Sequence, residues 1–164
     1  MEYLFRCATK EDIDAVFSLY EKRVQWMDAK GIHQWNGTDY LVIYPKSYYQ
    51  EQQACSALYV LLDDIDSIVG AVVLLQNDER WADRANDSSL YIHNLVTDPD
   101  VMGCGKKLLS EVEKLAQLHG KRYVRLDCAT DSVFLNGYYS SAGYEIAGQC
   151  KDGLYIGNRR EKKL

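Results

Sequence analysis

The hydrophobic positions of this chain follow two periods, and each period predicts a different kind of element. Apolar side chains recur every three or four residues within residues 13–24 and 108–119, which is the spacing of an amphipathic helix. Thr9 and Asp12 resemble a capping box at the start of the first of these segments. The expected helices cover residues 9–30, 47–55, 105–119 and 136–142.

Short apolar runs between these helices predict strands. Two of the runs flank the acidic segment 63–66, which favours a hairpin. Residues 77–89 are polar and lack periodicity, so we expect a loop there. The expected strands cover residues 4–8, 57–62, 67–75, 90–97, 123–128, 144–149 and 154–159. This order predicts a mixed α/β fold in a single domain, residues 1–164, with helices flanking a largely antiparallel sheet of six to seven strands.

Composition and charge narrow the class of protein. The chain has 164 residues, of which 47% are hydrophobic, and this fraction is sufficient for a core. Its formal net charge is −5, whereas general nucleic-acid binding needs a basic face. The basic run 159–163 is expected to be a solvated tail rather than a binding patch. We therefore expect no nucleic-acid partner.

The cysteines and histidines favour neither a disulfide framework nor a metal site. The five cysteines form no CxxC pair, and the three histidines lack metal-ligand spacing. No apolar run has the length of a signal peptide, or the ~20 residues of a membrane helix. We therefore expect a soluble, cytoplasmic protein with reduced thiols, no metal and no membrane partner.

The segment Val-Thr-Asp-Pro-Asp-Val-Met-Gly-Cys-Gly-Lys-Lys, residues 96–107, carries the strongest chemical signal. Acids are the residues favoured at a helix start, because the N-terminus of a helix presents unpaired amides and a positive dipole end. This helix instead begins with Lys106 and Lys107, and its first acid is Glu111. A bound anion would supply the missing negative charge, and Gly103 and Gly105 would let the backbone approach a phosphate.

One simpler interpretation of this segment stays open, and two other roles are disfavoured. Two glycines before a helix often form only a tight turn. The familiar nucleotide loops are absent, because the Walker spacing does not fit and Leu108 stands where the Rossmann fingerprint needs its third glycine. Cys104 invites a role as a nucleophile, since a helix start and lysines lower a thiol pKa, but no His-Asp pair lies near it in sequence. We expect no covalent role.

Three motifs in order resemble the GNAT superfamily of acetyl-CoA-dependent N-acetyltransferases. Residues 95–109 are similar to its acetyl-CoA motif, a strand followed by a glycine loop and a helix. Residues 136–144, Asn-Gly-Tyr-Tyr-Ser-Ser-Ala-Gly-Tyr, resemble its second signature, and Ala8-Thr9 with Asp12 matches its usual opening. One position departs: three residues before Gly103 the family usually has Arg or Gln, whereas this chain has Asp100, whose charge would repel a diphosphate.

The resemblance implies acetyl-CoA as co-substrate and assigns the residues that would hold it. The backbone of Leu95, Val96 and Thr97 would bind the pantetheine amides like an added strand. The amides of residues 102–107 would bind the pyrophosphate, with Lys106 and Lys107 supplying positive charge. These cofactor-binding candidates are Met102, Gly103, Cys104, Gly105, Lys106 and Lys107. Asn136 matches a position that can bond to the cofactor; capping of the short helix is an equally good interpretation.

Acetyl transfer also needs an acid for the leaving thiolate and a base for the incoming amine. Tyr139 matches the tyrosine of the family, and a tyrosine with a pKa of about 10 can protonate a thiolate whose thiol has a pKa of about 8.5. Tyr138 is assigned to packing, because adjacent helix positions point ~100° apart. His93 is the candidate base and on strand alternation shares a face with Leu95. Asp127, a relay through water and a purely structural His93 are the alternatives.

The acceptor pocket is expected in the first helix and the aromatic segment that follows. Trp26 and Trp35 are the substrate-binding candidates, and rings of this kind can hold an apolar amine or stack on a cation; core packing or a subunit interface is the alternative. The resemblance implies a small-molecule or peptide amine as substrate, and a homodimer. A non-catalytic acyl-CoA-binding module and a nucleotide-binding protein are the competing functions.

Overall fold

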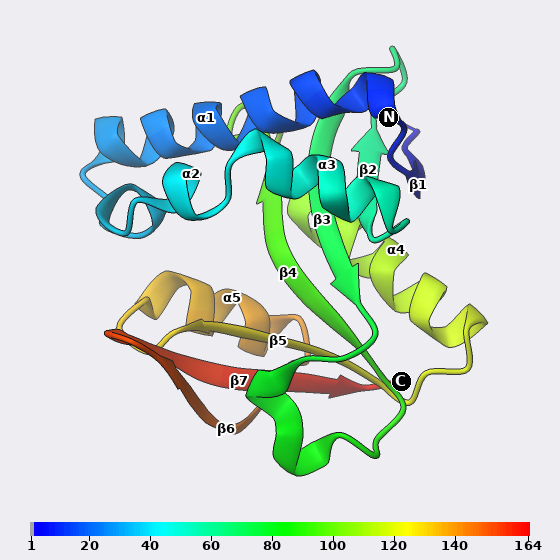
Figure 1. Cartoon of the computed structure of the whole chain (residues 1–164), viewed down its shortest axis with the longest axis vertical. Coiled ribbons are helices and arrows are strands. Elements are labelled where there is room, and N and C mark those ends of the chain that lie inside the picture. The colour runs from blue at the N-terminus through cyan, green and yellow to red at the C-terminus, as the bar shows by residue number, and fades with distance from the viewer. Residues whose placement is uncertain (1) are drawn as a thin grey trace. The chain divides into compact units, whose positions relative to one another are not determined.

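Seven strands form one hydrogen-bonded series in the computed structural model, which describes residues 2–164 (Figure 1). The order is β1-β2-β3-β4-β5-β7-β6. The β4–β5 pair is parallel, whereas β1–β2, β2–β3, β5–β7 and β6–β7 are antiparallel. The strands are β1 (Leu4–Cys7), β2 (Leu58–Leu62), β3 (Ile68–Leu75), β4 (Ser89–Thr97), β5 (Tyr123–Ala129), β6 (Glu145–Asp152) and β7 (Tyr155–Lys163). The expected mixed α/β fold is confirmed.

Helices lie between the strands except in the β2–β3 and β6–β7 pairs, and each of the four expected helices has a counterpart. The α-helices are α1 (Ile13–Lys30), α2 (Tyr40–Ile43), α3 (Lys46–Ala54), α4 (Cys104–Leu118) and α5 (Val133–Ser141). Three 3₁₀ helices, η1 (Lys10–Asp12), η2 (Trp35–Gly37) and η3 (Glu79–Arg84), complete the set. No helix within residues 2–164 is both long enough and apolar enough to cross a bilayer.

The described residues fall into two compact units, each made of two stretches of chain. Unit 1 contains the residues up to Leu74 together with Asn94–Leu109, and unit 2 contains Leu75–His93 and Ser110–Leu164. Both β4 and α4 contribute residues to both units. The single domain expected from the sequence therefore stays a prediction.

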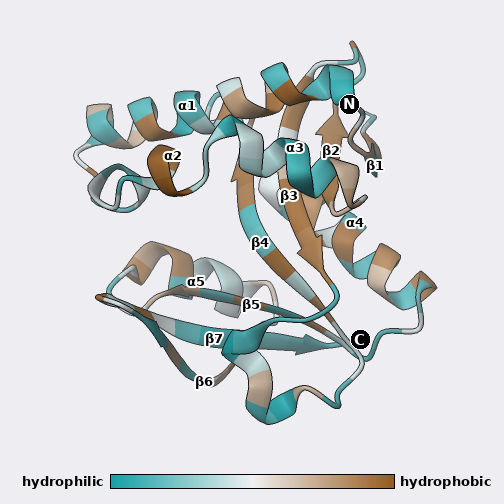
Figure 2. Ribbon diagram, viewed as in Figure 1, coloured by the Kyte–Doolittle hydropathy of each residue, from teal (hydrophilic) through white to brown (hydrophobic). Residues whose placement is uncertain are grey.

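In unit 1 the apolar face of α1 and the apolar strands form the core. The buried residues of α1 are Ile13, Val16, Leu19, Tyr20 and Met27, which follow the helical period. Figure 2 shows the apolar colour along β2 and β3. A Cβ at Gly70 of β3 would lie 3.3 Å from Leu108 of α4, so glycine permits close approach of the first turns of α4. The expected Thr9–Asp12 capping box is present.

In unit 2 the segment 77–89, expected to be a loop, contains η3 and is fixed by one tryptophan. Trp81 is fully buried, and the guanidinium groups of Arg125 and Arg159 each lie 4.8 Å from its ring centroid. Arg125 is also fully buried and donates to Asp87 at 2.6 Å and to Glu161 at 3.0 Å. This segment does not need apolar residues at a regular spacing, because cation–π stacking on Trp81 and paired charges stabilise it instead.

The expected solvated tail at residues 159–163 is wrong. Strand β7 extends to Lys163, and Arg159 and Arg160 are buried. Arg159 donates to Asp83, and Arg160 donates to the carbonyl of Tyr144 at 2.9 Å. Buried arginines of this kind are retained where acceptors pair with the guanidinium, and these acceptors lie on other segments of the chain.

Candidate functional site

The connection between β4 and α4, residues 98–103, ends on a glycine in the left-handed region. Gly103 has a φ of +82°, and a Cβ placed there would meet no atom within 4 Å. Its carbonyl accepts the amide of Lys107 at 3.2 Å. Gly105 lies inside α4 and has no positive φ, so the turn needs only one of the two glycines. The first amides of α4 have no acceptor within the helix and carry its positive dipole end.

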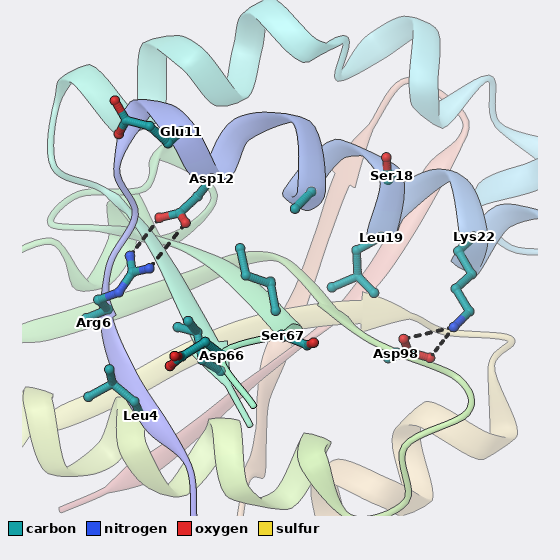
Figure 3. Close-up of a pocket in the computed structure, with 13 residues that line it drawn as sticks. Leu4, Arg6, Glu11, Asp12, Ser18, Leu19, Lys22, Asp66, Ser67 and Asp98 are labelled. Atoms are coloured by element: carbon teal, nitrogen blue, oxygen red, sulfur yellow. Dashed lines mark hydrogen bonds and ion pairs between the residues drawn. The ribbon is translucent and has the colours of Figure 1, made fainter. Parts of the chain in front are cut away.

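Asp98 organises this connection from its first residue. Its amide donates to the carbonyl of Val69 at 2.8 Å, and its own carbonyl accepts the amide of Val101 at 3.2 Å. Its carboxylate accepts the amide of Asp100 at 2.9 Å. Lys22 of α1 donates to both carboxylate oxygens, at 2.7 and 2.8 Å (Figure 3). Partial burial alone would raise the pKa of Asp98, but the Lys22 ammonium holds that pKa below its ordinary value.

Arg23, the residue after Lys22 in α1, holds the end of β4. Arg23 donates to the carbonyl of Thr97 at 3.1 Å and to its hydroxyl at 2.9 Å. The same guanidinium lies 5.0 Å from the ring centroid of Trp26. Trp26 is therefore engaged by a protein cation, and the Thr97 carbonyl already has a donor, which leaves Leu95 and Val96 as the stronger backbone candidates.

The surroundings of Asp100 and of Cys104, the first residue of α4, differ from what their sequence context suggests. Asp100 is 75% exposed at its side chain and pairs with Lys22 at 2.9 Å, so its charge is offset within the protein. Cys104 is buried and its thiol donates to the carbonyl of Val101 at 3.0 Å. Burial raises the pKa of that thiol, which is the reverse of an activated nucleophile.

Unit 1 also contains an aromatic cluster, formed by Tyr20, Trp35, Tyr40, Tyr44, Tyr48 and Tyr49. Trp35 stacks on Tyr40 with ring centroids 4.3 Å apart and planes 10° from parallel. Tyr40 and Tyr49 are buried, whereas Trp35, Tyr44 and Tyr48 are half-buried. Tyr40 and Tyr49 are thus part of the core, whereas Trp35 remains partly exposed.

Asn94 of β4 connects this cluster to the strand, and the sequence analysis did not identify it. Its φ is +51°, which interrupts the alternation of the strand. Its side-chain amide donates to the hydroxyl of Tyr40 at 2.6 Å, and its side-chain oxygen accepts from Tyr48 at 2.9 Å. Tyr20 donates to its carbonyl. Burial raises the pKa of Tyr48 to about 12, so that hydroxyl stays protonated as a donor.

Asn94→Ala should destabilise the protein more than Asn94→Gly. Both variants lose the bonds to Tyr40 and Tyr48, at about 1–2 kcal/mol. Alanine adds about 1–2 kcal/mol for the left-handed conformation, which glycine adopts freely. Urea unfolding measures both values; equal destabilisation by the two variants would contradict a left-handed Asn94.

In unit 2 the candidate acid Tyr139 lies on α5, which begins one residue after the cap Ser132. Tyr139 is 8% exposed, and its ring packs edge-on against Tyr138 and Tyr144, with centroids 5.4 and 6.0 Å away. Burial raises the pKa of its phenol well above 10. Tyr138 stacks on Phe134 at 6.2 Å, as expected of a packing residue.

Asn136 is engaged entirely within unit 2. Its amide nitrogen donates to the carbonyls of Ala129 at 2.9 Å and Ser132 at 2.8 Å. Its oxygen accepts from Asn158 at 2.8 Å and from Arg160 at 3.1 Å. The cap of α5 is Ser132, so the capping interpretation of Asn136 is wrong. Both donor hydrogens and the acceptor oxygen of the Asn136 side chain are thus used within the protein, which argues against a role as a cofactor ligand.

The candidate bases have different surroundings. The Nε2 atom of His93 lies 2.7 Å from the carboxylate of Asp78. Asp78 also accepts a hydrogen bond from the amide of Arg80. Burial alone would raise the pKa of Asp78, but the contact with His93 lowers that pKa below its ordinary value. Asp127 pairs with Arg80 at 3.2 Å and accepts the hydroxyl of Tyr155 at 2.6 Å, so its carboxylate is occupied. His93 belongs to unit 2 and Leu95 belongs to unit 1. Asn94 lies between them in the sequence.

A pocket with a volume of about 640 Å³ lies in unit 1 (Figure 3). Its apolar wall includes Leu4, Leu19 and Leu62, and the ion pairs Arg6–Asp12 and Lys22–Asp98 line it. No local sequence pattern indicates this pocket, because five separate segments of the chain form it. Among residues 2–164, no three His, Cys, Asp or Glu side chains are placed to hold a metal ion.

Residues 29–144 match the family described as the Acetyltransferase (GNAT) family. An uncharacterized N-acetyltransferase, YesJ, of Bacillus subtilis (strain 168) is 25% identical over 157 residues, covering 91% of this chain and 85% of the relative. A GNAT acetyltransferase from Listeria monocytogenes 4b F2365 superposes with a TM-score of 0.84 at 22% identity, covering 100% and 96% of the two chains. The PaiA N-acetyltransferase of Thermoplasma acidophilum, solved in complex with coenzyme A, superposes with a TM-score of 0.77 at 19% identity, covering 100% of both chains.

These likenesses include the segments that the site uses. The family match covers the β4–α4 connection and Tyr139. The relative from Bacillus subtilis extends the agreement to most of the chain. The chain therefore belongs to the GNAT family and is an N-acetyltransferase.

Proposed function

We propose that this enzyme transfers the acetyl group of acetyl-CoA directly to a primary amine of a small molecule or a peptide. The observation that carries the proposal is the β4–α4 connection: Gly103 turns in the left-handed region and α4 then starts with lysines rather than acids. Within the GNAT family, this is the place where a diphosphate would bind.

The backbone and two lysines would hold the cofactor. The amides of residues 102–107 would bind the diphosphate, with Lys106 and Lys107 adding positive charge. The pantetheine would pair with the backbone of Leu95 and Val96. In support, the residues of β4 that pair with β5 are Ser89, Leu90 and Tyr91. No later residue of β4 pairs with β5 in the part of the chain described.

The chemistry requires two proton transfers. The neutral amine attacks the thioester carbonyl carbon, and the C–S bond breaks as the tetrahedral intermediate collapses. The departing thiolate takes the phenolic proton of Tyr139, which is regained from solvent. The amine loses its proton to Nδ1 of His93, since Nε2 is held by Asp78, or to water. Asp78 thus acts as a positioning residue for the base.

The acceptor would bind at the exposed side of the aromatic cluster. Trp35 and Tyr44 offer partly accessible rings, which suit an amine that carries an apolar or aromatic group. Trp26 is a weaker candidate, because Arg23 already lies over its ring.

Acetyl-CoA binding and turnover test this function directly. Acetyl-CoA at 100 times its Kd should stabilise the protein by about 2.7 kcal/mol, measured as a rise in Tm, and thiol release should appear with at least one member of an amine panel. Stabilisation by acetyl-CoA without thiol release for any amine would favour the non-catalytic acyl-CoA-binding alternative. Stabilisation by ATP and not by CoA would overturn the proposal.

A further inference from the structure

The residues of α1 that contact the β4–α4 connection include one cation shared by two carboxylates. Lys22 lies 2.7 Å from Asp98 and 2.9 Å from Asp100. Hydrogen bonds to Asp98 first, and then to Asp100, raise the pKa of Lys22. The three side chains together carry one net negative charge, next to the amides that the proposed function assigns to a diphosphate.

The two carboxylates are held very differently. The side chain of Asp98 is 18% exposed and accepts three hydrogen bonds, two from Lys22 and one from the amide of Asp100. The side chain of Asp100 is 75% exposed. Solvent competes for an exposed ion pair and salt screens it, so the Lys22–Asp100 contact is the one that can open without disturbing the backbone.

We propose that Asp100 is a releasable partner of Lys22 that sets the affinity for the diphosphate of acetyl-CoA. The inference rests on the proposed function. In the ligand-free protein Asp100 holds Lys22, and the arriving diphosphate repels Asp100 from the connection. Lys22 stays on Asp98, where it is a positioning residue that keeps the connection in place. Because this repulsion opposes binding, the affinity for acetyl-CoA is weaker than the amides of residues 102–107 and the lysines of α4 would give without Asp100.

The test compares Asp100→Asn with Asp14→Asn. Asp14 lies on α1, is 85% exposed at its side chain and pairs with a lysine, Lys46, so its variant changes the net charge equally but at another place. Asp100→Asn should tighten Kd for CoA, and lower KM for acetyl-CoA, by about two- to fivefold at low salt, the range of an exposed ion pair. The gain should shrink in 1 M salt, with kcat and Tm unchanged.

Two further measurements separate the proposal from its alternatives. Pantetheine lacks the diphosphate, so its affinity should be the same in Asp100→Asn and in the parent protein. Lys22→Met should weaken CoA binding, and adding Asp100→Asn should restore part of the loss, because the two residues act on one another. Equal Kd values for CoA in the parent, Asp100→Asn and Asp14→Asn would overturn the inference while leaving the proposed function intact; absence of CoA binding by the parent protein would remove the proposed function itself.

Discussion

Replacing Tyr139 by phenylalanine should lower kcat by about 100-fold or more, since a positioned general acid contributes about 10²–10⁴-fold. Phenylalanine keeps the ring that packs edge-on against Tyr138 and Tyr144, so Tyr139→Phe should fold normally. Kd for CoA should change little, because the cofactor contacts proposed above are backbone groups and the two lysines of α4, not the hydroxyl of Tyr139. Steady-state kinetics with an identified acceptor, together with calorimetric CoA titration, measure both effects.

Tyr138→Phe is the matched control, as Tyr138 is the adjacent ring on the same helix. It should keep kcat within about twofold, which is the scatter expected of a neutral change. Comparable kcat values for Tyr139→Phe and Tyr138→Phe would remove Tyr139 as the acid and leave the thiolate to depart unprotonated.

The pH profile gives an independent check on Tyr139. Burial raises its pKa above the ordinary value of 10, so the phenol stays in its donating, protonated form until the pH exceeds that value. We expect no loss of kcat from Tyr139 ionisation below about pH 10. A falling alkaline limb below pH 9 that is absent in Tyr139→Phe would show that the working phenol is not the buried one described.

Removing Arg125, the fully buried arginine beside Trp81, should have the largest effect on stability. Arg125→Met leaves Asp87 and Glu161 without their shared partner and leaves one face of Trp81 without its guanidinium. Breaking a buried ion pair costs about 3–5 kcal/mol. We expect the lower end, about 3 kcal/mol, because Asp87 is 38% exposed and Glu161 keeps Arg84. Urea unfolding measures the loss.

Arg122→Met is the control for this change. Arg122 is exposed and its guanidinium lies 5.7 Å from the ring centroid of Tyr123, the ring that Arg125 also covers. A substitution at such a surface site should stay within about 0.5 kcal/mol. If Arg125→Met were as stable as Arg122→Met, the charge network would contribute nothing to unit 2.

Most elements of the fold could be predicted because their signals are local. The period of three to four residues in α1 and α4, and the short apolar runs of β2 and β3, depend only on near neighbours in sequence. Segment 77–89 could not be predicted, because its order comes from Trp81, whose stacking partners lie on β5 and β7. Arg159 was misjudged for the same reason, as its acceptor Asp83 is 76 residues away.

The site divides in the same way. The glycine before α4 and Tyr139 were identified from motif spacing, and the family match covers both; their roles stay proposals. Asn94 was missed because its left-handed φ and its tyrosine partners are properties of the folded chain. Asp78 was missed because it meets His93 only through the folded segment that follows β3.

The sequence alone determined the family and the order of the elements, because motif spacing and hydrophobic period are written in consecutive residues. Only the tertiary structure decided how the charges are shared. Asp100 looks like an obstacle to a diphosphate in the sequence, and it becomes a partner of Lys22 once α1 brings that cation to the β4–α4 connection. Lys22 and Asp98 are separated by 76 residues, and electrostatic interactions depend on distance in space rather than along the chain.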